Sequence, residues 1–396
     1  MYQLDAERAT NRTVHLLYAC VLLLTGIGLV TLYSASYAFA ERFFRNSHHF
    51  ISRQVVFGSI GLVLFFICSR IELENVRKII MPLVIIAAIL CFLTLIPGIG
   101  VERHGASRWI RIGSNTYQPS EMVKLVLPLY LAHIFDKKRE NINSFFRGIL
   151  PPILITGTFF ALIHAQNNFS TAVFIVVNAF ILFFLAGLHY RYFLSAILIF
   201  TPLSILLVFT KEHRVRRLIS FIRPEWDPLG AGFQVRSSLL TITSGGLLGT
   251  GIGQGTRKIA SVPEIHSDFI FAAFAEEAGF IGVSLFFALF AFFVFLGYRA
   301  AWLSSTPFRF LLAAGMTTML ASQMLLNIAV VSGALPATGV PLPFFSAGGS
   351  SIITSLVCAG FIVNVARGGG KKDTVDDMAF SGGDAGFNVL EGQDVR

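Results

Sequence analysis

The chain contains ten apolar stretches of about the length needed to cross a lipid bilayer, and this pattern limits its fold more than any other feature. A spanning helix needs about 17–25 mostly apolar residues, because the hydrocarbon core is ~30 Å thick. The stretches are residues 14–37, 50–68, 79–96, 122–135, 148–163, 169–188, 192–210, 269–297, 308–331 and 346–365. The sequence therefore predicts an all-α, polytopic integral membrane protein with about ten transmembrane helices.

Composition supports this prediction. Charged residues make up 13% of the chain and apolar residues 54%, whereas a soluble domain carries about 25% charged residues. A soluble enzyme, a disordered chain and a fibrous repeat are thereby excluded. The first apolar stretch is longer than the ~7–15 residues of a signal-peptide core, so we expect a retained span. The cysteines lie within apolar runs, which indicates small buried side chains rather than a disulfide framework or a zinc site.

An even number of spans places both termini on one side of the membrane, which we take to be the cytoplasm. Residues 1–13 then form a cytoplasmic N-terminus, residues 14–366 the membrane domain, and residues 367–396 a disordered cytoplasmic tail. Residues 211–268 form a long extracytoplasmic loop between spans 7 and 8. Lysines and arginines are nearly balanced between the two sides, although they normally favour the cytoplasmic side. The outer face of this chain, whose net charge is +9, is therefore unusually cationic.

Ionisable residues at membrane depth cost several kcal/mol unless they are paired or face a cavity, so they are candidates for function. Glu121 and Lys124 are three residues apart and share a helix face. They suit a structural ion pair and a functional site equally well. Arg108 and Arg111 flank Trp109 on the outer side, and the simplest interpretation of that cluster is an interfacial belt.

The long loop carries further cations. Arg214 and Arg216 lie near its start, and a glycine run at residues 249–255 precedes Arg257 and Lys258. A glycine-rich backbone beside cations can hold a phosphate. The run matches neither the dinucleotide-binding nor the P-loop pattern. By itself it favours a flexible turn with solvated charges.

Residues 263–282 combine acidic and apolar positions. Asp268 lies at the outer end of the eighth span, where a carboxylate can ionise and meet a substrate; a simple N-cap is the alternative. Glu276 and Glu277 lie deeper, and two adjacent glutamates cannot both face lipid cheaply. We favour structural pairing with other spans for these two residues.

The segment 335–351 has no charge, and its three prolines prevent regular structure. Gly348, Gly349 and Ser350 then begin the last span. Non-helical backbone at this depth must line a cavity or be buried in protein. Helix N-termini attract anions, while a re-entrant loop that only packs is the alternative.

These clusters together resemble the SEDS family (shape, elongation, division and sporulation) of polytopic peptidoglycan polymerases. The resemblance extends from about residue 33 to residue 351. It is carried by GASRWI at 105–110, QPSE at 118–121, WDP at 226–228, SGGLLGTGIGQGTRK at 244–258, PEIHSDFIFAAFAEEAGFIG at 263–282 and LPATGVPLPFFSAGGSS at 335–351. One such segment is weak evidence, but six in order are specific.

The resemblance implies a SEDS-type fold with ten spans and both termini inside. It also implies a glycosyltransferase that polymerises lipid II at the outer face of the cytoplasmic membrane. Asp268 matches the family's essential aspartate, with Ser267 in place of the commoner threonine. Glu121 and Lys124 match the functionally important pair. Ala347 stands where many members have tyrosine, a change that affects cavity lining rather than a catalytic group.

Division-type (FtsW-like) and elongation-type (RodA-like) members are both compatible with these segments. The start of the resemblance and the TGVPLP segment favour the division type, and hence septal cell-wall synthesis in the inner membrane. The resemblance further implies a class B penicillin-binding protein transpeptidase and other division proteins as partners. Lipid II, lipid-linked nascent glycan and membrane lipid complete the expected partners, and no nucleic acid is expected.

The hypothesis is an inverting glycosyl transfer in which Asp268 is the general base for a sugar hydroxyl. Cations would stabilise the departing lipid pyrophosphate. The expected substrate contacts are Arg108, Arg111, Glu121, Lys124, Arg214, Arg216, Arg257, Lys258 and Ser350. A divalent cation, Mg²⁺ or Mn²⁺, is compatible with such a donor, but the sequence shows no dedicated ligand set.

Two other function classes remain open. Intramembrane carboxylates and Lys124 would also suit a lipid II flippase, but the polar groups crowd toward the outer half, which favours chemistry there. A scaffold that only recruits a transpeptidase leaves the buried charges unexplained.

Overall fold

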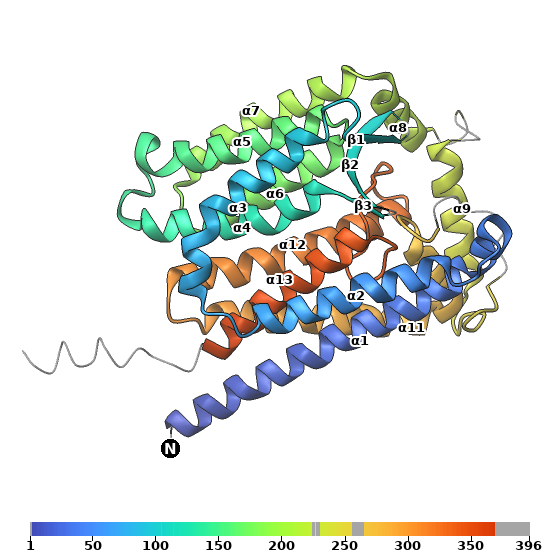
Figure 1. Cartoon of the computed structure of the whole chain (residues 1–396), viewed down its shortest axis with the longest axis horizontal. Coiled ribbons are helices and arrows are strands. Elements are labelled where there is room, and N and C mark those ends of the chain that lie inside the picture. Colours follow the sequence, from blue (N-terminus) through green and yellow to red (C-terminus); the bar gives the residue numbers. More distant parts are fainter. Residues whose placement is uncertain are drawn as a thin grey trace, which may run out of the picture.

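The computed structural model describes residues 2–103, 105–113, 115–223, 226, 230–255 and 265–368. Arg257, Lys258 and the predicted tail from residue 369 onward lie outside the described residues. Every apolar stretch predicted from the sequence forms a helix (Figure 1). These helices are α1 (Tyr2–Phe44), α2 (His49–Cys68), α3 (Leu73–Leu93), α4 (Pro119–Lys137), α5 (Leu150–Ala165), α6 (Phe169–Leu185), α7 (Tyr190–Phe209), α11 (Ile270–Trp302), α12 (Pro307–Val331) and α13 (Gly349–Gly368).

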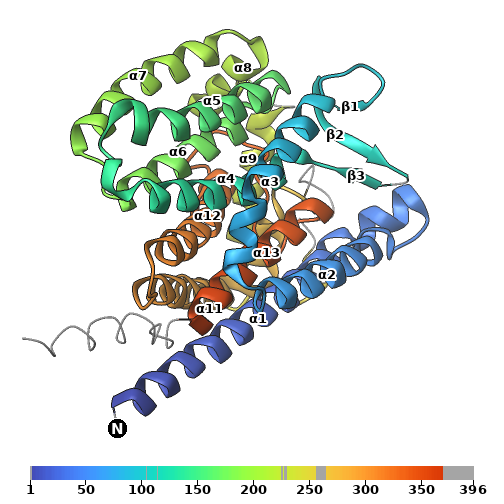
Figure 2. The same cartoon turned by 60° about the vertical axis from the view of Figure 1, so that its left-hand side comes forward.

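Eight helices of the described chain are long and apolar enough to cross a membrane, which makes this a multi-pass membrane protein. Helix α6 is shorter, with 17 residues. Helix α4 carries Glu121 and Lys124 and is buried along most of its length. It lies inside the bundle (Figure 2), where it packs against α3, α5, α6, α12 and α13. Because α4 contacts protein rather than lipid, its charges are compatible with membrane depth.

A small antiparallel sheet connects α3 to α4, and the all-α expectation did not include it. Its strands are β1 (Gly100–Arg103), β2 (Ala106–Ile112) and β3 (Asn115–Tyr117), in the order β1-β2-β3. Gly105 and Gly113 bound β2 with φ values of +72° and +59°, which glycine adopts without steric cost. Between them, Trp109 and its branched neighbours suit a pleated surface. The fold is therefore helical with one small sheet.

Four shorter elements complete the described chain. A 3₁₀ turn at Arg139–Asn141 and a π-helical turn at Phe145–Ile149 connect α4 to α5. The long segment after α7 contains α8 (Glu212–Ile222) and α9 (Ala231–Ser244). Helices α5, α6, α7 and α8 lie on one side of the molecule, and α1, α2 and α11 lie on the other (Figure 1).

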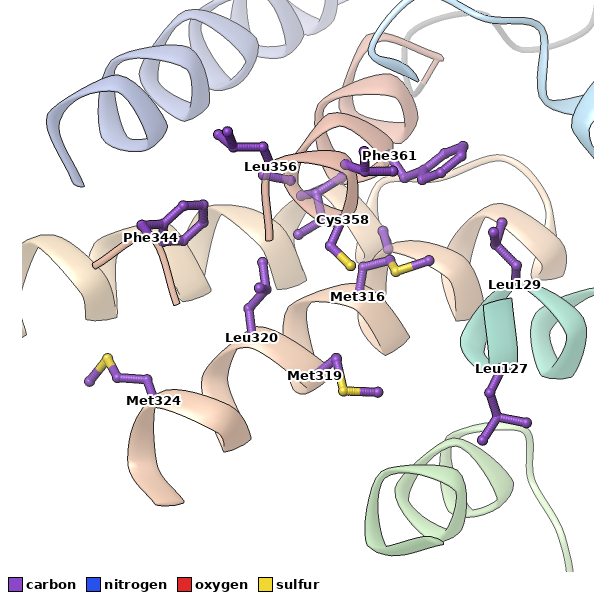
Figure 3. Packing of buried hydrophobic residues seen from close by; sticks show 14 of the residues in the cluster. Leu127, Leu129, Met316, Met319, Leu320, Met324, Phe344, Leu356, Cys358 and Phe361 are labelled. Carbon is purple, nitrogen blue, oxygen red and sulfur yellow. The ribbon is translucent and has the colours of Figure 1, made fainter. Parts of the chain in front are cut away.

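The core lies where α12 crosses the other helices. Met316 and Leu320 of α12 are buried close to Leu356 and Cys358 of α13, and Phe344 lies beside them (Figure 3). The cysteines are free thiols, of which Cys68 is half-buried and the others are buried. The expectation of small buried side chains thus holds, apart from that partial exposure. This packing buries α12 between its neighbouring helices.

Candidate active site

Asp268 lies in the turn directly before α11. Its backbone carbonyl accepts a hydrogen bond from Asn327 Nδ2 of α12 at 2.8 Å. Its side chain is half-buried and borders Gly339. A Cβ atom built on Gly339 would lie 3.6 Å from Asp268 Oδ2 and 3.7 Å from Arg108 Nη1. The carboxylate and the guanidinium therefore face the same small space.

Strand β2 brings Arg108 to this space. The Arg108 Nη2 atom donates to the carbonyl of Asn167 at 2.6 Å, and Asn167 Nδ2 donates to the carbonyl of Gly105 at 2.8 Å. These bonds tie the sheet to the turn between α5 and α6. Arg111 is three residues later on the same strand, so it points to the opposite face. It is exposed, and the structure does not bring it to Asp268.

Helix α8 contributes the next arginine. Arg214 is buried: its Nη1 atom donates to the carbonyl of Leu207 at 2.8 Å, and its guanidinium lies 5.0 Å from the ring centroid of Phe169. Arg216 lies on another face of the helix, where it forms an exposed ion pair with Glu212 at 2.9 Å. Of these two predicted contacts, only Arg214 lines the cavity described below.

Arg217, which the sequence did not single out, lies three residues after Arg214 and close to Asp268. Burial lowers the pKa of the Arg108 guanidinium to about 10; the positive charge of Arg217 acts in the same direction, and Asp268 opposes both. Burial also lowers the pKa of Arg217, again opposed by Asp268. Arg217 is exposed over much of its surface, so we regard its guanidinium as a cation at the rim of the site. Among the described residues, two arginines, Arg108 and Arg217, thus act on the Asp268 carboxylate.

A cavity of about 610 Å³ opens beside these arginines. Arg108, Arg214 and Arg217 line it, together with Asn168 at the N-terminus of α6. The apolar part of the wall comes from α6, α7, α8, α12 and the segment after α12: Phe169, Val173, Phe174, Val177, Val208, Leu218, Leu325, Leu326, Ala329, Leu335, Pro336 and Ala337. Its size falls in the range of small-molecule sites, about 300–1,000 Å³.

Several polar atoms around this cavity are buried and have no hydrogen-bond partner within the described part of the chain. They are Nε of Arg108, Nδ2 of Asn168, Nε of Arg214 and Oγ1 of Thr338. Buried donors are costly to leave unsatisfied. Three of them are nitrogen donors, and a helix N-terminus adds partial positive charge. The arrangement suits an anionic group attached to an apolar body.

Glu121 and Lys124 lie behind the cavity wall rather than on it. They form an ion pair of 2.7 Å, and their side chains are 3% and 1% exposed. Lys124 Nζ also donates to Gln323 Oε1 at 3.2 Å and lies 5.7 Å from the ring centroid of Phe174. Phe174 lines the cavity, whereas Glu121 and Lys124 do not, so the structure supports the ion-pair interpretation.

The start of α13 is packed against neighbouring helices. The Gly348 nitrogen donates to Gln54 Oε1 at 3.2 Å, and the Gln118 nitrogen donates to Ser350 Oγ at 3.1 Å. A Cβ atom on Gly349 would overlap the ring of Phe57. These contacts give Gly348, Gly349 and Ser350 packing roles, and the structure does not bring Ser350 to the cavity.

Glu277 pairs through its side chain with other segments, and Glu276 contacts the glycine run through its backbone carbonyl. Glu277 Oε1 accepts hydrogen bonds from Ser34 Oγ at 2.5 Å and from the Gly253 nitrogen at 2.9 Å. The carbonyl of Glu276 accepts from the Thr250 nitrogen at 2.9 Å. The described part of the glycine run therefore docks on α11 rather than forming the flexible turn that the sequence favoured, while its charges, Arg257 and Lys258, lie outside the described residues.

The docking coincides with a break in α11 at Gly279, whose φ is +63° and ψ is −171°. The nitrogen of Phe280 donates instead to the carbonyl of Gly246 at 2.9 Å. A Cβ atom on Gly279 would overlap the backbone nitrogen of Gly249. Only glycine fits this close approach.

Sequence reasoning missed several residues at the site. Arg217 could have been found from the sequence, because it follows Arg214 by three residues, and residues three apart share one face of a helix. Asn168, Gln323 and Asn327 carry no charge, and amides within apolar helices give a weak signal. Their roles depend on which carbonyls the fold places beside them.

Among the described residues, no group of three or more His, Cys, Asp or Glu side chains is placed to hold a metal ion. The described charged neighbours of Asp268, Arg108 and Arg217, are cations, which do not suit a resident divalent cation. No chemical step is therefore assigned to a metal here.

Similar proteins agree with this architecture. The chain is 37% identical over 343 residues to the probable peptidoglycan glycosyltransferase FtsW of Geobacter sulfurreducens, covering 87% of this chain and 92% of that protein. It is 38% identical over 352 residues to the stage V sporulation protein E of Bacillus subtilis, covering 89% and 96%.

Solved structures have the same fold. One chain of a peptidoglycan synthase complex, described as coordinating polymerization and crosslinking, matches with a TM-score of 0.72 and 27% identity, over 89% of this chain and 96% of that chain. The rod shape determining protein RodA of Thermus thermophilus matches with a TM-score of 0.65 and 25% identity, over 89% and 95%. The profile of the FtsW, RodA and SpoVE family, described as cell cycle proteins, matches residues 14–369. The chain therefore belongs to this family, as the resemblance to the SEDS proteins implied.

Proposed function

We propose that this protein is a peptidoglycan glycosyltransferase that polymerises lipid II into glycan strands at the outer face of the cytoplasmic membrane. One observation carries the proposal. The Asp268 carboxylate and Arg108 both border Gly339, and Arg108 and Gly339 line a cavity whose wall carries three arginines and is otherwise largely apolar. The FtsW relatives, which are described as probable peptidoglycan glycosyltransferases, support the same activity.

The cavity matches the chemistry of a lipid-linked sugar. The three arginines and the N-terminus of α6 suit a pyrophosphate, and the apolar wall suits a polyprenyl chain. The unsatisfied donors at Arg108, Asn168 and Arg214 would gain partners from phosphate oxygens.

Asp268 would accept the proton of the acceptor's 4-hydroxyl, on the GlcNAc of lipid II. The hydroxyl oxygen attacks the anomeric carbon of the lipid-linked nascent glycan and forms the new glycosidic bond with inversion. The bond between that carbon and the pyrophosphate oxygen breaks, and the lipid pyrophosphate leaves with the electron pair. The arginines stabilise its charge as it develops. A divalent cation from solution, Mg²⁺ or Mn²⁺, is proposed only as a further counter-ion.

The test is polymerisation of purified lipid II by the full-length protein. Replacing a general base typically costs about 10²–10⁴-fold in rate, so we expect Asp268→Asn to lose that much. Glu212→Gln, on the exposed face of α8, is the control and should retain the wild-type rate. A folded Asp268→Asn protein with wild-type rate would refute the assignment. Scrambling of fluorescent lipid II without polymerisation would instead identify a flippase.

We place this activity at the division septum rather than in elongation. The support is that several curated relatives at 35–38% identity are FtsW or SpoVE proteins, whereas a RodA structure is 25% identical. The proposed topology has both termini in the cytoplasm and residues 211–268 outside. In this topology membrane lipid surrounds the membrane domain, and residues 1–13 and 367–396 lie on its cytoplasmic side. Arg257 and Lys258 would add positive charge to the outer loop.

The proposed partner is a class B penicillin-binding protein transpeptidase, together with other division proteins. A structure of a synthase complex that couples polymerization and crosslinking supports this pairing. Adding such a transpeptidase to the polymerisation assay should raise the rate, and localisation of a fluorescent fusion would separate a septal from a lateral-wall role.

A further inference from the structure

Two amide side chains on α12 connect the turn that carries Asp268 with the buried ion pair of α4. Gln323 and Asn327 are four residues apart, so they share one helix face. Their side chains are buried, with 3% and 1% exposed. Neither residue lines the cavity. Their hydrogen bonds therefore serve the protein itself.

Asn327 bridges two segments. Its Nδ2 atom donates to the carbonyl of Asp268 at 2.8 Å and to the carbonyl of Val340 at 2.9 Å. Backbone carbonyls only accept hydrogen bonds, so the nitrogen of the amide must face them. One side chain thus fixes the residue with the catalytic carboxylate and the segment beside Gly339.

Gln323 extends the connection inward. Its Nε2 atom donates to the carbonyl of Pro341 at 2.9 Å, and its Oε1 atom accepts from Lys124 Nζ at 3.2 Å. Lys124 is held in turn by Glu121. These two bonds fix a single orientation of the Gln323 amide, because the Lys124 ammonium only donates and the Pro341 carbonyl only accepts.

We propose that Asn327 is a positioning residue, which holds Asp268 and residues 339–341 at the separation that the reaction needs. Gln323 anchors the same segment to the Glu121–Lys124 pair. This inference rests on the proposed function. The inference gives the Glu121–Lys124 pair a role at the site without contact with substrate. The pair anchors one end of a series of hydrogen bonds, and Asp268 lies at the other end.

The first experiment compares Asn327→Leu with a matched control, Asn364→Leu. Asn364 Nδ2 also bridges two carbonyls, those of Cys68 and Ile71, both at 2.7 Å. It lies near the C-terminal end of α13, remote from Asp268. Both variants lose the same kind of bridge, so a purely structural effect should be similar in both.

A lipid II binding assay measures the number of folded sites in each sample, and the polymerisation rate measures the chemical step. A misplacement of about 1 Å can cost 10²-fold in rate. We therefore expect kcat per binding site to fall about 10²-fold in Asn327→Leu, with the Kd for lipid II unchanged. Asn364→Leu should keep the wild-type kcat per site. Equal kcat per site in Asn327→Leu and wild type would overturn the proposal.

A second variant decides the matter if Asn327→Leu does not fold. Gln323→Met keeps the side-chain length but removes the bond to Pro341 and the acceptor for Lys124. We expect about a tenfold loss of kcat with unchanged Kd. Wild-type kcat in this variant would refute the chain of hydrogen bonds.

Hydrogen exchange separates this proposal from the proposed function. In Asn327→Leu, the backbone amides of residues 265–269 and 338–340 should exchange faster, and Asn364→Leu should leave them unchanged. If wild type fails to polymerise lipid II, the proposed function is wrong, yet this exchange pattern would still support the positioning role. Unchanged exchange in those two segments would reject it whatever the activity.

Discussion

Asp268 Oδ2 and Arg108 Nη1 both lie within van der Waals distance of a single missing methyl group, the one that Gly339 lacks. The two residues come from distant parts of the chain, one before α11 and one in β2. The absence of a side chain at residue 339 keeps the space between them open for a reacting group.

Filling this space should reduce activity without unfolding the protein. In Gly339→Ala the new Cβ would sit 3.6 Å from Asp268 Oδ2, which is ordinary contact, so stability should change by less than about 1 kcal/mol. One added methyl group in a pocket typically costs about tenfold or more in kcat/KM. Gly26→Ala, where nothing lies within 4 Å, is the control. Lipid II kinetics and melting curves measure both quantities; full activity would show that the space is not used.

Arg108 and Arg111 should differ strongly although they share one strand. Arg108→Gln removes a donor at the cavity and should lower kcat/KM by about 10²-fold. Arg111→Gln changes the opposite face of β2 and should stay within about threefold of wild type. Steady-state polymerisation of lipid II checks both variants. Equal losses would mean that the strand presents both arginines to the substrate.

Breaking the buried ion pair should destabilise the protein. Lys124→Met leaves Glu121 buried without its partner, which typically costs about 3–5 kcal/mol. The exposed pair of Arg216 and Glu212 provides a comparison, since Arg216→Gln should cost less than about 1 kcal/mol. Unfolding in detergent gives both free energies. The double variant Glu121→Gln with Lys124→Met should regain part of the loss.

The break in α11 should tolerate no side chain. Gly279→Ala places a Cβ against the backbone of Gly249 at a φ of +63°, and it should destabilise the protein by about 2 kcal/mol or more. Gly157→Ala is the control, because it lies in α5 with no atom within 4 Å. That change should be neutral or should stabilise by up to about 1 kcal/mol. The melting temperatures of the two variants test this prediction. Equal changes in Gly279→Ala and Gly157→Ala would contradict the close approach of Gly279 to Gly249.

The helices could be predicted from the sequence because apolar stretches of spanning length allow few other structures. The sheet could not, since Arg108, Trp109 and Arg111 suit an interfacial belt as well as a strand. Once β2 forms, successive side chains alternate between its two faces, so Arg108 and Arg111 lie on opposite faces. The sequence motif alone does not show this separation.

The candidate site was predictable to a similar extent. Asp268 could be named because it lies at the aqueous end of a span and matches the essential aspartate of the family that the sequence resembles. Glu121 and Lys124 were identified as a pair, but their distance from the cavity depends on the packing of Phe174. Asn327 acts only through the carbonyls of Asp268 and Val340, which the fold brings together.

Helix α4 has a consequence for how the chain is made. Its stabilising neighbours α12 and α13 are encoded near the C-terminus, so they leave the ribosome long after α4 has reached the membrane. During that interval α4 meets lipid without them. The partner of Lys124 is Glu121, one turn away on the same helix. The ion pair can therefore form as soon as α4 does, and this neutralises its charges until the last helices are inserted.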